Sequence, residues 1–380
     1  MSNIIDYVNE YGEKTCVDRE FCEADALVLS QLAYFKWDKL IPPLFDESGS
    51  DMPDVMLKDI CRDMDTEYVY GHGNFPEDDA RLLQSMAHSP RFMNMACNYY
   101  LADTRVAENM QFAAMTFRLE GALPIIVFRG TDGTLVGWKE DFYIAFTKPY
   151  AAAFMSSRYV SSVAERLGGD FMISGHSKGG NMATFAAMNQ EKPIRERITD
   201  VYCFDGPGLR PEVLEEYNYS AIASRMHKFL PKSSLVGVVL EGATDYVTVK
   251  CKGVGGLWQH NPYTWCTSGD GFVTEEDIKK GSQIVHKSLN GWLMDLEEDD
   301  ISLVIESLFE VLESTEAKRI PEILDNKLNS LKAMKDTVQG IDKEKRDKIK
   351  KVMKMLLEEV YRCLMDQIKD QKQETGIKPL

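Results

Sequence analysis

The spacing of apolar residues divides the chain into three stretches of different character. Residues 1–105 show mainly helical periodicity, in which apolar side chains recur every three or four positions. One helix is predicted to begin at Asp18 or Glu23. Two further helices are predicted over 51–64 and 76–86. This first stretch is therefore expected to be a helical segment that packs on the rest of the chain.

Short apolar runs alternate with helical stretches over residues 106–273. This alternation predicts a mostly parallel sheet with helices on both faces, and its first two strands form a predicted hairpin. The predicted strands are 112–119, 124–128, 171–173, 201–204, 225–230 and 246–249, the last of which ends the sheet. The predicted helices among them are 150–167, 182–190 and 211–219.

Helical periodicity dominates again from Thr274 to the C-terminus. The residues 274–277 (TEED) are typical of a helix N-cap. Three apolar stripes follow, over 301–312, 324–338 and 349–364, and the tail from Asp370 is expected to be disordered. We interpret residues 274–380 as a helical region that packs on the α/β core (106–273), on a second copy of the chain in a homo-oligomer, or on a regulatory partner.

Composition and charge narrow the class of protein. Hydrophobic residues make up 44% and charged residues 27% of the 380 residues, a balance typical of a soluble globular protein. The formal net charge of −16 disfavours nucleic acid and anionic membranes as partners. No apolar run is long enough for a transmembrane segment, no signal peptide is visible, and the eight cysteines include no C-x-x-C pair. We therefore expect a cytoplasmic protein without a metal site.

One short motif carries the candidate chemistry. Gly175-His176-Ser177-Lys178-Gly179 follows the apolar run 171–173 and is followed at once by a helix-compatible stretch. G-x-S-x-G between a strand and a helix is typical of a nucleophile elbow, in which a sharp turn exposes the serine at a helix N-terminus. We therefore predict Ser177 as a nucleophile. The N–H of Lys178, and that of Thr131 in the loop after the second strand, are the predicted oxyanion donors.

A serine nucleophile needs a histidine base and an acid that orients it. In proteins with a serine elbow between a strand and a helix, the triad follows the chain order Ser, acid, His. Of the three histidines after Ser177, His227 lies in a predicted strand and His286 in a predicted helix, whereas His260 lies in a loop after the last strand. We predict His260 as the base, and we interpret the upstream His72, between two glycines, as a loop residue.

The acid has three candidates. The usual position after strand 225–230 holds Ser233-Ser234 and no carboxylate. Asp205, at the end of the preceding strand, is the first candidate because it lies beside the nucleophile strand. Asp245 is the second, and a Ser-His dyad helped by Ser233 or Ser234 is the third.

These motifs together resemble the class-3 (fungal-type) lipases, which are α/β-hydrolases with a Ser-His-Asp triad. The chain is more similar to a bacterial, lipase-like family of largely unknown function labelled Mbeg-like. The resemblance covers about residues 20–270 and implies Ser177 as nucleophile, His260 as base and Thr131 as oxyanion residue. The shared segments are 25–32, 128–142 (FRGTDGTLVGWKEDF), the GHSKGGN elbow, 204–208, 234–237 and 259–265.

The chain departs from the class-3 pattern at the acid, because Ser233-Ser234 stand where those lipases have an aspartate. Asp205 is similar in position to the acid of pancreatic-type lipases, which follows the strand before the one that precedes the class-3 acid. The chain also has Asn261 where the Mbeg-like pattern often has an acidic residue. We expect a cofactor-free hydrolase that cleaves acyl esters or lipids through an acyl-Ser177 intermediate. The alternatives are an acyltransferase and a non-catalytic or regulatory protein that uses its helical tail for protein contacts.

Overall fold

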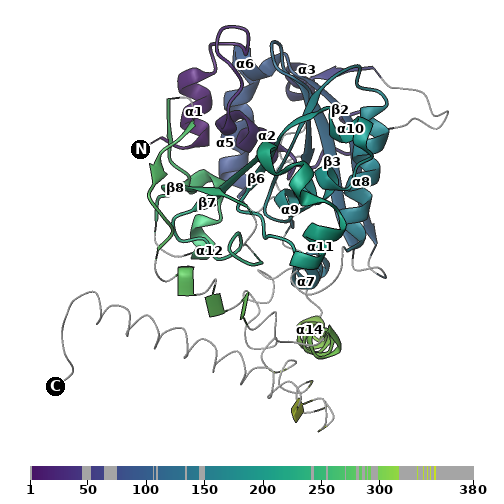
Figure 1. The fold of residues 1–380 in the computed structure, drawn as a ribbon. Helices are drawn as coiled ribbons and strands as arrows, with labels where there is room; N and C mark the ends of the chain where they lie inside the picture. Colours follow the sequence, from purple (N-terminus) through teal and green to yellow (C-terminus); the bar gives the residue numbers. More distant parts are fainter. Residues whose placement is uncertain are drawn as a thin grey trace.

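A nine-stranded sheet forms the centre of the structure, which is a computed structural model (Figure 1). It describes residues 2–44, 53–63, 75–105, 107, 110–132, 135–144, 150–240, 244–253, 256–269, 271–279 and 298–315, with isolated positions between 282 and 347. The strands lie in the order β1-β2-β3-β4-β5-β6-β7-β8-β11. Their bounds are β1 Val55–Met56, β2 Ala96–Arg105, β3 Met110–Arg118, β4 Ile125–Phe128, β5 Phe171–His176, β6 Ile198–Phe204, β7 Met226–Pro231, β8 Tyr246–Val249 and β11 Thr274–Glu275.

The centre of this sheet is parallel and both edges are antiparallel. β4 to β8 run parallel, whereas β1, β2 and β3 pair antiparallel at one edge and β11 at the other. β3 and β4 form the predicted hairpin. Because parallel neighbours need crossover connections, helices separate β4 from β5, β5 from β6 and β6 from β7. The predicted α/β-hydrolase architecture is confirmed.

Helices cover both faces of the sheet. Their bounds are α1 Ile4–Tyr11, α2 Glu23–Leu32, α3 Leu57–Asp63, α5 Pro76–Ala87, α6 Pro90–Met93, α7 Leu135–Ile144, α8 Ala151–Ala164, α9 Lys178–Met188, α10 Lys192–Arg195, α11 Pro211–Glu216, α12 Gly256–Gln259 and α14 Glu298–Glu313. Short 3₁₀ turns are η2 Tyr219–Ala221, η3 Ala223–Arg225 and η4 Pro262–Thr264, and a small second sheet pairs β9 Thr267–Ser268 with β10 Gly271–Phe272.

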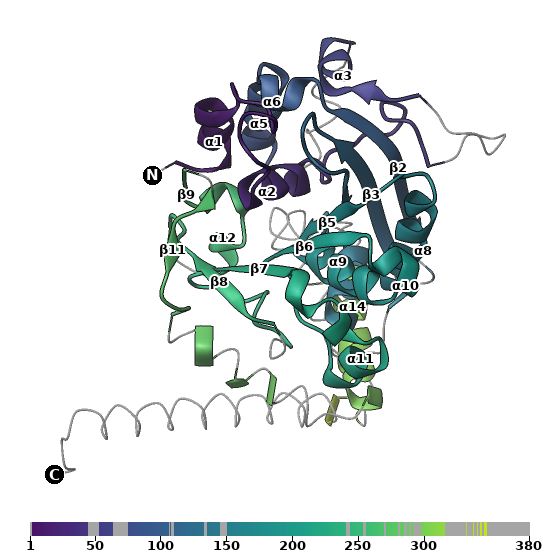
Figure 2. The same ribbon diagram turned by 45° about the horizontal axis from the view of Figure 1, so that its top comes forward.

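The two faces carry separate hydrophobic cores. Successive side chains of a strand point to opposite faces. On β4, Ile125 and Val127 therefore pack with α1, α2 and α5, whereas Ile126 and Phe128 pack with α8 and α9. Figure 2 shows α1, α2, α5 and α6 together on one side of the sheet and α8 and α10 on the other.

A buried ion pair holds the N-terminal helices together. Arg91 makes two bonds to the Asp25 carboxylate, 2.7 and 2.5 Å long, and both side chains are fully buried. The Tyr7 hydroxyl donates to the same carboxylate (3.0 Å). Because the charges are paired and hydrogen-bonded, the desolvation cost of each is offset. The pair joins α1, α2 and α6 and so fixes α2, which contacts β5.

The C-terminal helix α14 packs on α7, as Figure 1 also shows. Glu306 on α14 accepts from Lys139 (2.7 Å) and from the Tyr143 hydroxyl, both on α7. Ile305 and Phe309 of α14 are buried. The helical periodicity predicted over 301–312 is confirmed, and most of the two later stripes and the tail lie outside the described residues.

Three strands lie in segments that were predicted to be helical: β1 within the predicted helix 51–64, β2 in the first stretch, and β11 after residue 273. β2 was missed because its first half, Ala-Cys-Asn-Tyr-Tyr, has no alternation: all five residues are buried. The N-cap prediction at Thr274 is wrong, because the backbone of residues 274–275 pairs with β8 as β11. β8 is therefore not the last strand. All three errors arise because long-range strand pairing overrides local propensity.

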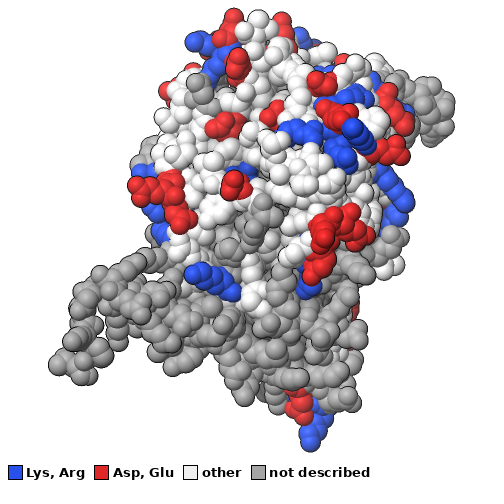
Figure 3. Space-filling view, viewed as in Figure 1, with Lys and Arg blue, Asp and Glu red and all other residues white. Residues whose placement is uncertain are grey.

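Charged side chains of both signs are scattered over the face shown in Figure 3. An acidic group lies over α11, whose exposed glutamates are Glu212, Glu215 and Glu216. In the described part of the chain, no helix has both the length and the apolar character that a membrane crossing needs.

A buried carboxyl group connects the N-terminal helices to the loop after His260. Asp79 on α5 accepts from the Tyr263 hydroxyl (2.6 Å) and from the Gln31 amide (2.8 Å) through one oxygen. Its other oxygen is buried and has no hydrogen-bond partner among the described residues. Burial is the main reason that the pKa of Asp79 is raised from 3.8 to about 6.

The raised pKa predicts a pH dependence of stability. Between pH 3.8 and about 6 only the folded chain holds the Asp79 proton, so the stabilisation that Asp79 gives is complete below this window and is lost as the pH rises through it. Relative to Asp79→Asn, the unfolding free energy of the wild type should fall by about 3 kcal/mol between about pH 4 and pH 7. Urea unfolding of both proteins checks this. A constant difference across that range would contradict it.

Candidate active site

The turn between β5 and α9 places Ser177 in a strained backbone conformation. Its φ of 59° and ψ of −131° are rare for a residue with a side chain and cost about 1–3 kcal/mol. The Ser177 N–H donates to the Phe204 carbonyl (2.9 Å), and the Ser177 carbonyl accepts from Gly180 N–H (2.9 Å). These bonds hold the serine, 8% exposed, at the N-cap of α9.

The first turn of α9 presents a backbone donor next to this serine. The N–H groups of Gly180 and Asn181 donate hydrogen bonds to the Ser177 carbonyl. Among the described residues, the Lys178 N–H has no hydrogen-bond partner. An unpaired N–H at a helix N-terminus stabilises negative charge in front of it. Lys178 therefore stays a candidate oxyanion donor.

The loop after β4 packs directly against the elbow. A Cβ at Gly179 would lie 2.2 Å from a carbonyl oxygen at the end of β4, and one at Gly130 would lie 2.7 Å from a carbonyl oxygen at the end of β5. Glycine at both positions lets these backbones approach closely. The hydroxyl of the next residue, Thr131, lies 2.7 and 2.6 Å from the two oxygens of Asp141 and donates to this carboxylate. The Thr131 hydroxyl is therefore bound to Asp141, and the Thr131 N–H stays a candidate oxyanion donor.

Asp205 and His260 form a short hydrogen bond, 2.6 Å from Nδ1 to Oδ2. Asp205 is fully buried, whereas 22% of the His260 side chain is exposed. A carboxylate only accepts, so Nδ1 carries the proton and a neutral ring leaves a lone pair on Nε2. This is the tautomer that can remove a proton from a serine hydroxyl.

The structure brings Asp205 to His260. It also shows that Ser234, which was considered as a helper of a Ser-His dyad, bonds to Asp205. The second oxygen of Asp205 accepts from the Ser234 hydroxyl (2.5 Å) and from a backbone N–H of the same loop (3.0 Å). Ser234 therefore supports the carboxylate and does not replace it. Asp245, which precedes β8, makes no ion pair with His260 within the described residues.

Several hydrogen bonds fix the loop that carries His260. The Gln259 side chain accepts from Ser233 N–H (2.8 Å) and donates to the Gly253 carbonyl (3.0 Å). The Trp265 indole donates to the Gln259 carbonyl (2.9 Å), and Trp265 is fully buried. The loop position is thus set by the β7 end on one side and by the hydrophobic core on the other.

A buried ion pair joins the first residue of α9 to α7. Lys178 Nζ bonds the Glu140 carboxylate on α7 (2.6 Å), and the two side chains are 1% and 2% exposed. Burial raises the pKa of Glu140, against the opposing effect of the Lys178 ammonium. Burial also raises the pKa of the neighbouring Asp141 to about 6. The sequence does not predict that Glu140 is buried in an ion pair with Lys178, because a glutamate on a helix is usually exposed.

Comparison with known proteins places the chain in a family. Residues 86–310 match the family model described as Mbeg1-like. The chain belongs to the Mbeg1-like family. The resemblance predicted from the sequence motifs is thereby confirmed. A search of curated proteins found no match. Among solved structures, the chain is similar to one described as the crystal structure of M37 lipase, with 12% identity, a TM-score of 0.35, and coverage of 58% of this chain and 70% of that chain.

The Ser177 hydroxyl and His260 Nε2 are not joined by a hydrogen bond in the described part of this Mbeg1-like chain. Catalytic hydrogen bonds are often long without substrate and tighten only in its complex. His227 pairs with Asp200 on the sheet (2.8 Å), and His72 and His286 lie outside the described residues. No cluster of metal-ligating side chains occurs among the residues searched, which are those described above.

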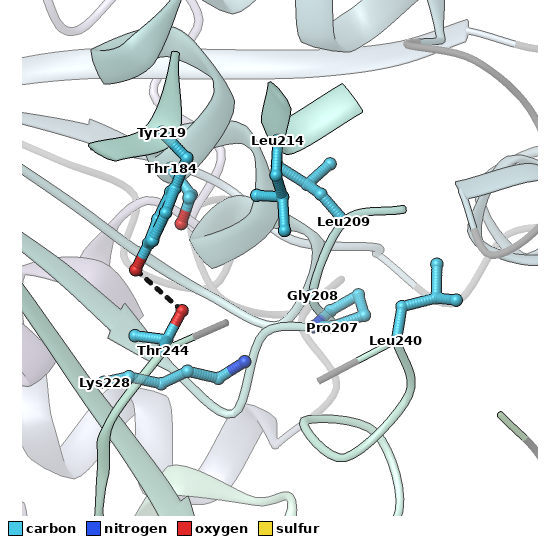
Figure 4. Close-up of a pocket in the computed structure, with 9 residues that line it drawn as sticks. All are labelled: Thr184, Pro207, Gly208, Leu209, Leu214, Tyr219, Lys228, Leu240 and Thr244. Atoms are coloured by element: carbon cyan, nitrogen blue, oxygen red, sulfur yellow. Dashed lines mark hydrogen bonds between the residues drawn. The ribbon is translucent and has the colours of Figure 1, made fainter. Parts of the chain in front are cut away.

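A small pocket lies beside the segment that follows Asp205 (Figure 4). The buried Lys228 side chain points toward Pro207 and Gly208, and the Tyr219 and Thr244 hydroxyls are hydrogen-bonded (2.9 Å) at its wall. The pocket has room for little more than a water molecule, and none of the candidate site residues lines it. It is too small for an acyl ester.

Proposed function

We propose that this protein is a serine hydrolase that cleaves carboxylic esters of lipid or other small acyl compounds. The observation that supports this best is the 2.6 Å bond from His260 Nδ1 to the buried Asp205, beside a serine in a strained elbow. A buried carboxylate bonded to Nδ1 orients the imidazole and stabilises the imidazolium that forms when Nε2 accepts a proton.

In the proposed reaction, Ser177 Oγ attacks the acyl carbon while its proton passes to His260 Nε2. Asp205 stabilises the imidazolium, and the N–H groups of Lys178 and Thr131 stabilise the oxyanion. Collapse of this intermediate breaks the ester bond, and the leaving alkoxide takes the proton from His260. Water then attacks acyl-Ser177, gives its proton to His260, and the acid is released as the proton returns to Oγ. An alcohol in place of water would make the enzyme an acyltransferase.

One observation favours the alternative of a non-catalytic protein. The Ser177 hydroxyl makes no hydrogen bond to His260 among the described residues. If substrate does not close this gap, the fold serves another task, such as protein contacts through the C-terminal helices. The same experiments decide between the two candidates.

Ser177 should be labelled by a fluorophosphonate, because the reagent reports a serine activated by a base. Mass spectrometry of the peptide that holds Ser177 measures the adduct, and Ser177→Ala and His260→Ala should abolish it. The wild type should hydrolyse p-nitrophenyl esters, with the preferred chain length given by a graded series. An unlabelled Ser177, under conditions that label a control esterase, would support the non-catalytic alternative.

Asp205→Asn should lower kcat by about 10³- to 10⁴-fold, because an amide at this position no longer holds the His260 tautomer with Nδ1 protonated. Asp245→Asn is the matched control and should leave kcat within about twofold of the wild type, since it makes no ion pair with His260 in the described region. Ester kinetics on both variants give the comparison. Equal losses in the two variants, or a larger loss in Asp245→Asn, would remove Asp205 as the acid.

A further inference from the structure

A directed chain of hydrogen bonds leads from the N-terminal segment to His260. His176 is buried, and burial lowers the pKa of its ring well below the ordinary value, so the ring is neutral. His176 Nε2 lies 2.9 Å from the His260 carbonyl oxygen, which only accepts, so Nε2 carries the ring's one proton. Nδ1 is then an acceptor, and the Tyr34 hydroxyl donates to it (2.9 Å).

His176 also contacts the His260 ring itself. The two ring centroids are 4.6 Å apart and the rings are inclined by 34°. His260 is therefore held at its backbone carbonyl and at its ring by the same residue, and at Nδ1 by Asp205. A shift of His176 would move Nε2 of His260 relative to Ser177, which is the next residue after His176.

The Tyr34 hydroxyl is at the same time in contact with the oxyanion loop. A Cβ at Gly130 would lie 2.1 Å from the Tyr34 hydroxyl oxygen. This oxygen is therefore in close contact with the Gly130 backbone. One hydroxyl thus contacts the loop that holds Thr131 and, through His176, the loop that holds His260.

Tyr34 is fixed in place by α2. Its N–H donates to the Gln31 carbonyl in the turn that ends the helix (3.1 Å). α2 is joined to β5 by the bond between the Ser30 and Ser174 hydroxyls (2.7 Å). Ser174 and His176 are two residues apart on β5 and therefore face the same side of the sheet. The helix and the strand thus present Tyr34 and His176 to each other as a rigid pair.

We propose that Tyr34 is a positioning residue of the active site, whose hydroxyl sets His260 through His176 and the oxyanion loop through Gly130. The inference rests on the proposed ester hydrolysis. Tyr34 lies outside the residues matched by the Mbeg1-like model, 86–310. The N-terminal segment therefore supplies part of the site and does not only cover the sheet.

Tyr34→Phe removes the hydroxyl and keeps the ring. It should lower kcat at least about tenfold and leave KM unchanged, because the base and the oxyanion loop act on the reaction and not on ester binding. Tyr159→Phe is the matched control: Tyr159 is a buried residue of α8 whose hydroxyl also donates, here to a carbonyl of β2 (2.6 Å). Equal kcat values in the two variants would overturn the proposal.

His176 gives a second test that does not depend on Tyr34. His176→Gln keeps an N–H that can donate to the His260 carbonyl, whereas His176→Leu fills a similar volume without a donor. We expect His176→Gln to retain most of the kcat that His176→Leu loses, at similar melting temperatures. If both variants lose kcat equally, the bond to His260 has no positioning role.

Histidine ring NMR separates this proposal from the proposed function. With ¹⁵N-labelled histidine, Tyr34→Phe should shift the ring signals of both His176 and His260, whereas Tyr159→Phe should leave them in place. If the wild type cleaves no ester and Ser177 stays unlabelled, the proposed function fails, and these shifts alone decide whether Tyr34 positions His260. Unchanged His260 signals in Tyr34→Phe would overturn the positioning role in either case.

Discussion

The candidate site depends on the hydrogen bonds that pair the buried Asp205 carboxylate. A charged group with no exposed surface is stable only when its oxygens are fully paired. Asp205 meets this need with partners from two separate loops, the Ser234 loop after β7 and the His260 loop after β8. The carboxylate therefore fixes the distance between these loops and the end of β6. The position of His260 follows from it.

The elbow adds a second constraint at the end of the neighbouring strand. Ser177 keeps a strained backbone because its N–H bonds to β6 and its carbonyl caps α9. The close approach of Gly130 to the end of β5 leaves no space for a side chain there. Parallel strands end at the same edge of a sheet, so the candidate nucleophile, the candidate acid and the candidate oxyanion loop lie at that edge.

Much of this site could be predicted from the sequence because its parts are local. The Ser177 elbow is a contiguous motif between a strand and a helix, and His260 was found by eliminating histidines in regular elements. The acid was less certain, because Ser234 occupies a position where a carboxylate was expected, and only the three-dimensional structure shows that its hydroxyl serves Asp205. Tyr34 and Glu140 have no local signature: their roles come from packing between elements far apart in the chain. The strands β1, β2 and β11 were missed for the same reason.

The central claim is that Ser177, His260 and the two backbone donors surround one reacting carbon. A crystal structure of the protein with a bound alkyl phosphonate measures this directly, because the phosphorus resembles the tetrahedral intermediate. The account predicts a covalent bond to Ser177 Oγ, a phosphoryl oxygen about 2.7–3.1 Å from the N–H nitrogens of Lys178 and Thr131, and His260 Nε2 within hydrogen-bond distance of Ser177 Oγ or of the ester oxygen. A phosphonate whose oxygen points away from these donors, or one attached to another residue, would contradict it.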